Sequence, residues 1–395
     1  MNMLPEIEFS IQAATAEFIQ PLLTEFEAKY HVHVKLRLLT WDAAWGELVK
    51  VALYNDGPDI SEVGSTWLGD LMSMSALHAF TTEEIVQLGK ASRFLPTAWQ
   101  GCQVSDQPEM WAIPWLVGAR LIFFRRDLLL GTGVDEDTAF ATAENFERTL
   151  HLLEEHHVPT PWLVPTALTH TTLLNAASWV WAAGGDFISP DYKHVLIARH
   201  QSLVGLRNYF ALGRYIPPAL RQIGALQPDT HFLQHADTAV TIGGPWMFNF
   251  FTAEARENMG LALPLGAPML GGSHLVIWKH SRKQDLALKL IQFLTQTSTQ
   301  VSYARRIGLL PAVVDALNEE PFTTDRLWRA AVQAIKAGRT VPTTRSWGLM
   351  EDRLATEFAA VWLDFFDNPT IDLVTLLKRR LEPLAERLDQ VLAQA

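Results

Sequence analysis

The first 80 residues alternate between strand-like and helix-like patterns, and this alternation restricts the fold more than any other feature of the chain. Residues 7–11, 32–38 and 60–63 have the apolar or alternating patterns of short strands. Each is followed by a segment with apolar residues at helical spacing. This βαβαβα order predicts a parallel, doubly wound sheet with right-handed crossovers.

Ligands of doubly wound sheets bind beyond the carboxyl ends of the strands. The residues that follow the three expected strand ends are therefore candidates for a binding site. They are Thr15, Trp41, Ser65 and, in the next helix, Trp67 and Asp70. Packing of the tryptophans in the core is the alternative interpretation.

Residues 239–248, AVTIGGPWMF, predict a second strand end of this kind. An apolar strand leads into Gly243 and Gly244, and Pro245 occupies the first position of a helix. The free backbone N–H groups at such a helix start are available to a ligand, and the ring of Trp246 can cover an apolar ligand face. A buried core tryptophan is again the alternative.

The second half of the chain has one further glycine-rich segment and a long helical end. Residues 271–274, GGSH, predict a glycine turn, followed by a strand over residues 275–278. Beyond Val313 the pattern is helical, with one loop over residues 340–347 and another at 368–369. The apolar stripes of these helices must pack against other parts of the protein.

Composition narrows the class of protein. A chain of 395 residues exceeds one ordinary core, so two lobes are expected, and 48% hydrophobic with 19% charged residues describes a globular chain. The net charge of -11 argues against nucleic-acid binding. The single cysteine, Cys102, excludes an internal disulfide and a multi-cysteine metal site. A total of 14 tryptophans is typical of proteins that bind carbohydrates or aromatic ligands.

Catalytic and cofactor motifs are absent from the sequence. It contains no GxSxG elbow, Walker A loop, GxGxxG after a strand, HExxH or CxxC. The histidine- and glutamate-rich segment 151–157 superficially resembles a metal site, but its charges fit a solvated helix end. We therefore expect no cofactor and no metal, and the residues suit holding a small molecule better than transforming it.

Four segments, in order, resemble the family 1 extracellular solute-binding proteins of ABC importers, a family that includes the maltodextrin-binding protein. The first two are DGPDI at 56–60 with Trp67, and WAIPW at 111–115 with LIFFRRD at 121–127. The third is AVTIGGPW at 239–246. The fourth combines residues 271–278, 287–294 and 308–311.

The resemblance implies an α/β, periplasmic-binding-protein-like (type II) fold with two lobes, a hinge and a helical C-terminal tail. Lobe one is expected to be residues 1–115 plus 262–311, and lobe two 116–261 plus 312–395. Trp67 and Asp70 align with sugar-contacting residues of the maltodextrin-binding relative, and Trp246 and Trp347 align with its stacking aromatics. The full expected ligand-binding set is Thr15, Trp41, Ser65, Trp67, Asp70, Trp115, Gly244, Trp246, Gly272, Ser273, Arg345 and Trp347.

By this resemblance the protein captures a mono- or oligosaccharide in an interlobe cleft and delivers it to the permease subunits of an ABC importer. Aromatic rings would cover the sugar faces, while polar groups would bind the hydroxyls. The expected partners are a small-molecule sugar and the transporter; we expect a monomer, no nucleic acid and no enzymatic reaction. The alternatives are a receptor for a non-sugar solute such as a polyamine or phosphodiester, a cytosolic ligand sensor, and an enzyme.

The resemblance implies an extracytoplasmic location, in the periplasm or at the cell surface. No apolar run is long enough to span a membrane. We expect no signal peptide in this chain, because residues 1–5 lead almost directly into the first strand. A cytoplasmic location therefore stays open as an alternative.

Overall fold

The computed structural model describes residues 4–104 and 108–393. These residues form two compact units, each built from discontinuous segments. Unit 1 contains the described residues up to Gly118, with Gly271–Val332 and Pro342–Gly348. Unit 2 contains Ala119–Leu270, Gln333–Val341 and the described residues from Leu349 onward.

The boundaries of the units differ from the expected lobe boundaries. The sequence placed the second boundary at 261/262 and the third at 311/312, whereas the units change at 270/271 and 332/333. The change at 270/271 coincides with the start of a strand, Leu270–Ile277, that belongs to unit 1. Motion of the units as lobes about a hinge stays a prediction.

Unit 1 is built on a six-stranded sheet with the order β10-β4-β9-β3-β1-β2. Its first three strands are the predicted ones, and β1 pairs in parallel with both β2 and β3. Strand β9 then adds to β3 in the antiparallel direction. The strands are β1 (Glu6–Gln12), β2 (His33–Leu39), β3 (Ile60–Gly64), β4 (Ile113–Ala119), β9 (Leu270–Ile277) and β10 (Leu310–Pro311).

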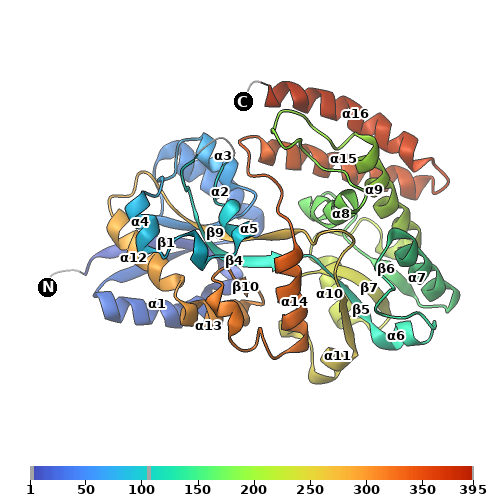
Figure 1. Ribbon diagram of the computed structural model, residues 1–395, viewed down its shortest axis with the longest axis horizontal. Helices are drawn as coiled ribbons and strands as arrows, with labels where there is room; N and C mark the ends of the chain where they lie inside the picture. The colour runs from blue at the N-terminus through green and yellow to red at the C-terminus, as the bar shows by residue number, and fades with distance from the viewer. Residues whose placement is uncertain (1–3, 105–107, 394–395) are drawn as a thin grey trace. The chain divides into compact units, whose positions relative to one another are not determined.

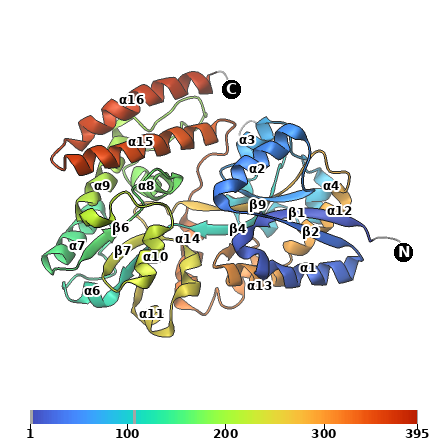
Figure 2. The same cartoon turned by 180° about the vertical axis from the view of Figure 1, so that it is seen from behind.

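Helices cover both faces of this sheet. Helices α1 and α13 lie on one side, and α2 and α3 lie on the other (Figures 1 and 2). The α-helices are α1 (Ala16–Tyr30), α2 (Trp41–Tyr54), α3 (Leu68–Ser73), α4 (Thr82–Gln87), α5 (Pro96–Gln100), α12 (Gln284–Leu294) and α13 (Thr297–Ile307). The 3-10 helices are η1 (Ala13–Thr15), η2 (Ala91–Arg93) and η6 (Asp315–Asn318).

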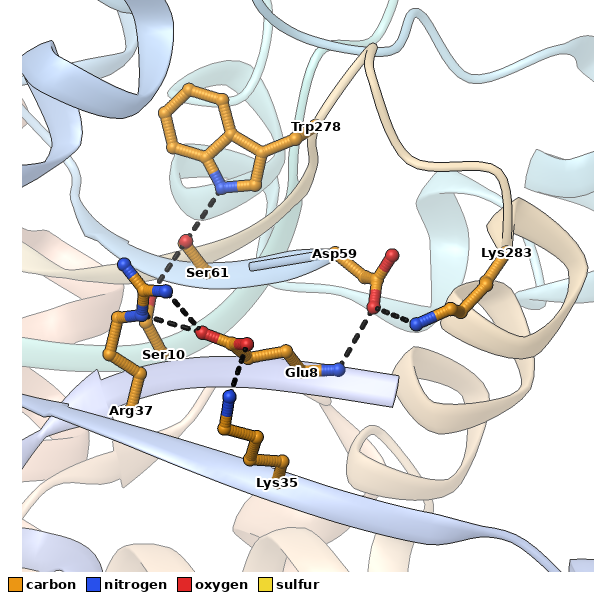
Figure 3. Close-up of polar contacts among 8 residues, drawn as sticks. All are labelled: Glu8, Ser10, Lys35, Arg37, Asp59, Ser61, Trp278 and Lys283. Carbon is orange, nitrogen blue, oxygen red and sulfur yellow. Dashed lines mark hydrogen bonds and ion pairs between the residues drawn. The ribbon is translucent and has the colours of Figure 1, made fainter. Parts of the chain in front are cut away.

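Polar side chains hold β1, β3 and β9 in register inside unit 1 (Figure 3). The hydroxyl of Ser61 accepts hydrogen bonds from Ser10 at 2.6 Å and from the indole of Trp278 at 2.7 Å. Asp59 accepts a bond from the backbone N–H of Glu8 at 2.9 Å and pairs with Lys283 at 3.2 Å. These contacts satisfy polar groups that would otherwise be costly to bury.

The glycines of residues 271–274 lie inside β9, so the prediction of a glycine turn there is wrong. The strand continues because Gly272 adopts a φ of 141°, which side chains rarely tolerate. A Cβ at Gly272 would meet the carbonyl oxygen of Leu116 at 2.1 Å. The glycine therefore lets neighbouring backbone approach, rather than reversing the chain.

Unit 2 contains a smaller sheet with the order β6-β7-β5-β8. Strand β5 is antiparallel to its neighbours β7 and β8, and β6 is parallel to β7. The strands are β5 (Leu121–Arg125), β6 (Thr160–Leu163), β7 (Thr238–Gly243) and β8 (Met259–Ala262).

The helices of unit 2 include most of the predicted helical tail. Helices α8, α9, α15 and α16 stack on one side of the small sheet (Figures 1 and 2). The first part of unit 2 has α6 (Arg126–Leu130), α7 (Ala143–Glu155), α8 (His170–Ala182), α9 (His200–Ala211), η3 (Leu212–Tyr215) and η4 (Pro218–Leu220). It continues with α10 (Gln227–Gln234), η5 (Pro245–Phe250), α11 (Ala253–Asn258), α15 (Trp347–Asp367) and α16 (Leu373–Leu392).

Helix α14 (Arg326–Ala337) crosses from unit 1 into unit 2 between Val332 and Gln333. Helix α15 begins just before the chain enters unit 2 for the last time, at Leu349. The segment between them has no regular structure, as the predicted loop at 340–347 requires. Within the described residues, no helix combines the length and the apolar character needed to cross a membrane.

Candidate functional site

Three tryptophans of unit 1 form one cluster at the ends of β2 and β3. The rings of Trp41 and Trp67 lie 5.3 Å apart, and those of Trp45 and Trp67 lie 5.8 Å apart. Trp41 and Trp45 are neighbours because they are four residues apart in α2. Trp41 is 48% exposed, so this tryptophan cluster presents an aromatic surface to solvent rather than filling the core.

Glycine sets the position of Trp67. A Cβ on Gly64, the last residue of β3, would come within 3.1 Å of the Trp67 ring. The backbone N–H of Ser65 donates to the carbonyl of Gly272 at 3.1 Å, which ties this strand end to β9. The structure thus brings together four of the expected ligand-binding residues: Trp41, Ser65, Trp67 and Gly272.

The loop before α15 packs against α3 of unit 1. Asp70 accepts a hydrogen bond from the N–H of Gly348 at 3.1 Å. A Cβ on Gly69 would lie 2.0 Å from the carbonyl oxygen of Thr344. This close approach places Arg345, which is exposed, and Trp347 in the same unit as Asp70.

Thr15 precedes α1 without capping it through its side chain. It occupies the N-cap position, but its side chain makes no capping bond. Its hydroxyl instead donates to the carbonyl of Gln12 at 2.8 Å, because η1 precedes the helix. Thr15 is half-buried and lies just beyond the carboxyl end of β1, where the sequence predicted a ligand site.

Four of the expected residues are buried, as core residues are: Trp115, Ser273 and Trp347, described here, and Gly244, described with Trp246 below. Trp115 is 0% exposed; its ring stacks on Tyr303 at 5.0 Å and lies 6.1 Å from Phe9. Ser273 and Trp347 are each 1% exposed. For Trp115 the contacts within unit 1 explain the burial, so the structure does not support a solute contact by this residue.

Trp246 in unit 2 occupies the predicted place after a strand and a glycine pair. Gly244 is the N-cap of η5, and Pro245 starts this 3-10 helix. A Cβ on Gly244 would lie 1.9 Å from the ring of Trp246, so the ring packs directly against this buried glycine. The indole N–H donates to Asp229 at 2.8 Å. Trp246 is half-buried, so it matches neither a fully buried core tryptophan nor a fully exposed ligand-binding one.

A charged side chain covers the ring of Trp246. The guanidinium carbon of Arg120 lies 5.2 Å from the ring centroid, a cation–π arrangement. Burial lowers the pKa of Arg120, whereas the nearby Asp229 raises it. Burial likewise raises the pKa of Asp229, against the opposing effects of Trp246 and Arg120. The site therefore concentrates two opposite charges around one aromatic ring.

Sequence reasoning missed Arg120 and Asp229. Arg120 is the one charged residue in an apolar segment just before β5, and this pattern could have marked it as a candidate. Asp229 had no comparable signal, because its contact with Trp246 joins residues 17 positions apart through the packing of α10 against η5. Trp45, the third member of the tryptophan cluster, was not among the expected ligand-binding residues.

Other features of the described residues lie away from these positions. A surface hollow of about 830 Å³ in unit 1 is lined by residues of α13 and by Glu319, and includes none of the expected ligand-binding residues. In the segment 151–157, His151 pairs with Glu155 at 3.3 Å on an exposed face of α7. Both features fit solvated helix surfaces.

Comparison with known proteins identifies the family. The model of the family described as bacterial extracellular solute-binding protein matches residues 10–301. The chain belongs to this family. The resemblance seen in the sequence is thereby confirmed, and so is membership in a family of binding proteins.

Relatives agree over nearly the whole length. The diacetylchitobiose binding protein DasA of Streptomyces coelicolor is 22% identical over 357 residues, which cover 84% of this chain and 78% of DasA. An ABC transporter solute binding protein of Thermotoga lettingae, solved with α-D-tagatose, is 20% identical with a TM-score of 0.83 and covers 99% of this chain and 100% of its own.

A second solved structure, the GacH receptor of Streptomyces glaucescens, was determined unliganded and in complex with acarbose. It is 16% identical with a TM-score of 0.80, over 98% of this chain and 99% of its own. These similarities confirm the predicted α/β, periplasmic-binding-protein-like (type II) fold.

Proposed function

We propose that this protein is a receptor that captures a carbohydrate outside the cytoplasm and delivers it to an ABC importer. The observation that carries the proposal is the match to the solute-binding family over residues 10–301. The names of the similar proteins support a sugar as the solute, because they bind diacetylchitobiose, tagatose and acarbose. The protein acts as a monomer, performs no reaction on its ligand and binds no nucleic acid.

In this proposal the tryptophan cluster of unit 1 covers the apolar face of a sugar ring. Stacked aromatic contacts suit the C–H groups on that face, and Trp41 has the exposed surface for such contacts. Ser65, Asp70, Thr15, Gly272 and Arg345 supply polar groups around it. In unit 2, Gly244 and Trp246 are the proposed ligand-binding residues. Trp347 stays in the proposed set on the family resemblance.

A thermal-shift screen against mono- and oligosaccharides tests the proposal. A ligand that binds only the folded protein raises the melting midpoint by mass action. The screen contains N,N′-diacetylchitobiose, maltose, tagatose and their monosaccharide relatives, and hits are confirmed by calorimetric titration. Recovery of the sugar unchanged after incubation supports a receptor, whereas a product would identify an enzyme.

Two aromatic residues of α2 provide a matched pair of variants for any hit. Trp41 begins the helix within the tryptophan cluster, and Tyr54 ends it with 74% of its surface exposed. Trp41→Ala is expected to weaken sugar binding by about 1–3 kcal/mol, in the range of aromatic–base stacking. Tyr54→Ala is expected to leave binding unchanged. Equal effects of the two variants would contradict the role of the cluster.

A further inference from the structure

Unit 2 contains two constellations of arginine, tryptophan and aspartate. In the first, Arg120 lies over Trp246, whose indole N–H donates to Asp229. We call these three residues the first triad. In the second triad, Arg339 lies over the ring of Trp181 at 4.6 Å, and the Trp181 indole donates to Asp186 at 3.1 Å. In both triads, therefore, an arginine lies over a tryptophan ring whose indole N–H donates to an aspartate.

The two triads differ in what their arginine binds. Arg339 donates to the second oxygen of Asp186 at 2.8 Å, so the second triad satisfies its own charges. Arg120 and Asp229 make no ion pair within 4.0 Å. Among the described residues, none accepts a hydrogen bond from the Arg120 guanidinium. Its donors are therefore available, although the group is partly buried.

Two buried polar side chains next to Arg120 are bonded at most to each other. Tyr209 is 0% exposed and Asn175 is 1% exposed. Among the described residues, the Tyr209 hydroxyl and the Asn175 amide have no hydrogen-bond partner beyond each other. Tyr209 lies within electrostatic reach of Arg120, and Asn175 lies beside Tyr209. Buried polar groups are normally satisfied, so the Arg120 donors, together with the remaining bonding capacity of this pair, favour a polar group from outside the chain at this position.

A guanidinium group offers a planar fork of donors that matches a carboxylate or a phosphate. In the second triad Asp186 supplies the carboxylate. We propose, building on the receptor function proposed above, that in the first triad the solute supplies it. The Arg120 guanidinium binds an anionic oxygen group on the carbohydrate, as in a uronic acid or a sugar phosphate. Trp246 and Asp229 hold Arg120 in place for this contact.

This arrangement changes the role expected for Trp246. One face of its ring is covered by Arg120, and Gly244 packs against it as well. Trp246 is therefore a positioning residue for the guanidinium in addition to any contact it makes with the sugar. Asp229 keeps the ring oriented through the indole bond, and its own charge competes with the solute for Arg120.

The test is calorimetric titration of the full chain with matched sugars: glucose, glucuronic acid and glucose 6-phosphate, and galactose and galacturonic acid, with N,N′-diacetylchitobiose, maltose and tagatose as neutral references. An acidic member is expected to bind about 10- to 100-fold more tightly than its neutral counterpart, the range for hydrogen bonds to charged groups. The carboxylate and phosphate arms show which anionic group fits. The preference is expected to decrease as salt concentration rises.

Three variants separate binding from folding. Arg120→Gln is expected to abolish the preference for the acidic sugar while retaining neutral sugar binding, where that is present. Asp229→Asn keeps an oxygen acceptor for the Trp246 indole and removes the competing charge, so it is expected to tighten binding of the acidic sugar. Arg339→Gln, the matched control in the second triad, is expected to lower the melting midpoint and leave the affinity unchanged.

Neutral sugars that bind as tightly as their acidic counterparts would overturn this inference and leave the receptor function intact. An acidic sugar that binds Arg120→Gln as tightly as the original protein would also overturn it, provided that the variant shows a cooperative melting transition. If none of the sugars binds, both the inference and the proposed function fail.

Discussion

The candidate residues of unit 1 and unit 2 differ in how their polar groups are used. In unit 1, the Thr15 hydroxyl and the Asp70 carboxylate bind the backbone of their own unit, and the exposed surface is aromatic. In unit 2, the candidate site is charged, because the partly buried Arg120 has donors without an acceptor among the described residues. In the proposed function, unit 1 thus offers surface for stacking, and in the further inference unit 2 offers a charge for recognition.

The difference has a physical cause in the local packing. Glycines in both units let other groups approach the backbone: Thr344 approaches Gly69 in unit 1, and Trp246 packs on Gly244 in unit 2. In unit 1 the approaching group is a backbone segment, which brings its own donors and acceptors. In unit 2 it is an indole ring, whose single N–H donates to Asp229 and which itself offers no oxygen acceptor to the neighbouring guanidinium.

The largest expected effect separates core from surface tryptophans. Trp115→Ala is expected to lower the free energy of unfolding by about 3–5 kcal/mol, because it leaves a cavity beside Tyr303 and Phe9. Trp246→Ala should cost less, since its ring is half-buried. Urea unfolding of both variants measures the difference. An equal loss for the two would show that Trp246 is a core residue and would break the comparison.

The next effect is a pH dependence that arises in unit 1. Burial lowers the pKa of His274, next to Ser273 in β9, to about 4. Between the ordinary value of about 6.5 and pH 4, the unfolded chain binds a proton that the folded protein does not. The free energy of unfolding therefore decreases as pH falls through this window, by up to about 3 kcal/mol from this residue.

His274→Gln isolates this contribution, because it removes the titrating group and leaves the other groups in place. Buried Glu62 in the same unit has a raised pKa and the opposite effect, with stability lost as pH rises above its ordinary value. The melting midpoint is measured from pH 7 to pH 4.5. If the variant and the original protein show parallel pH profiles, His274 titrates normally in the fold.

A smaller effect tests the glycines of the two units. Gly69→Ala places a Cβ against the backbone of Thr344, and Gly244→Ala places one against the Trp246 ring. Each is expected to cost about 1–3 kcal/mol of stability by overpacking. Only Gly244→Ala should also displace the Arg120 guanidinium and reduce the affinity for an acidic sugar.

Gly271→Ala is the control for both variants, because a Cβ there would meet nothing within 4 Å. It is expected to change neither stability nor affinity. A loss of acidic sugar affinity in Gly69→Ala equal to that in Gly244→Ala would remove the distinction between the units.

Apart from the controls, the smallest expected effect on folding is at Trp41. This ring is 48% exposed, so Trp41→Ala should change the free energy of unfolding by about 0.5 kcal/mol or less. Its effect should instead appear in the affinity for neutral and acidic sugars alike, because stacking does not depend on charge. A selective loss for acidic sugars would assign a role in charge recognition to unit 1.

The sequence by itself determined the elements that follow from local patterns. The alternating strands and helices up to α3, the strand before Gly243, Pro245 at the start of a helix, and the loop before α15 are present as predicted. Periodicity and the backbone preferences of glycine and proline act over a few residues, so they are readable from the chain alone. The order of motifs also identified the family.

Only the tertiary structure decided how these elements use their side chains. The sequence assigned Trp115 and Trp246 to the site on equal terms, but packing placed the first against Tyr303 in the core and the second beneath Arg120. It also carried β9 through an expected turn at Gly272. These outcomes depend on contacts between residues far apart in the chain, which are set by the packing of whole elements and leave no local pattern in the sequence.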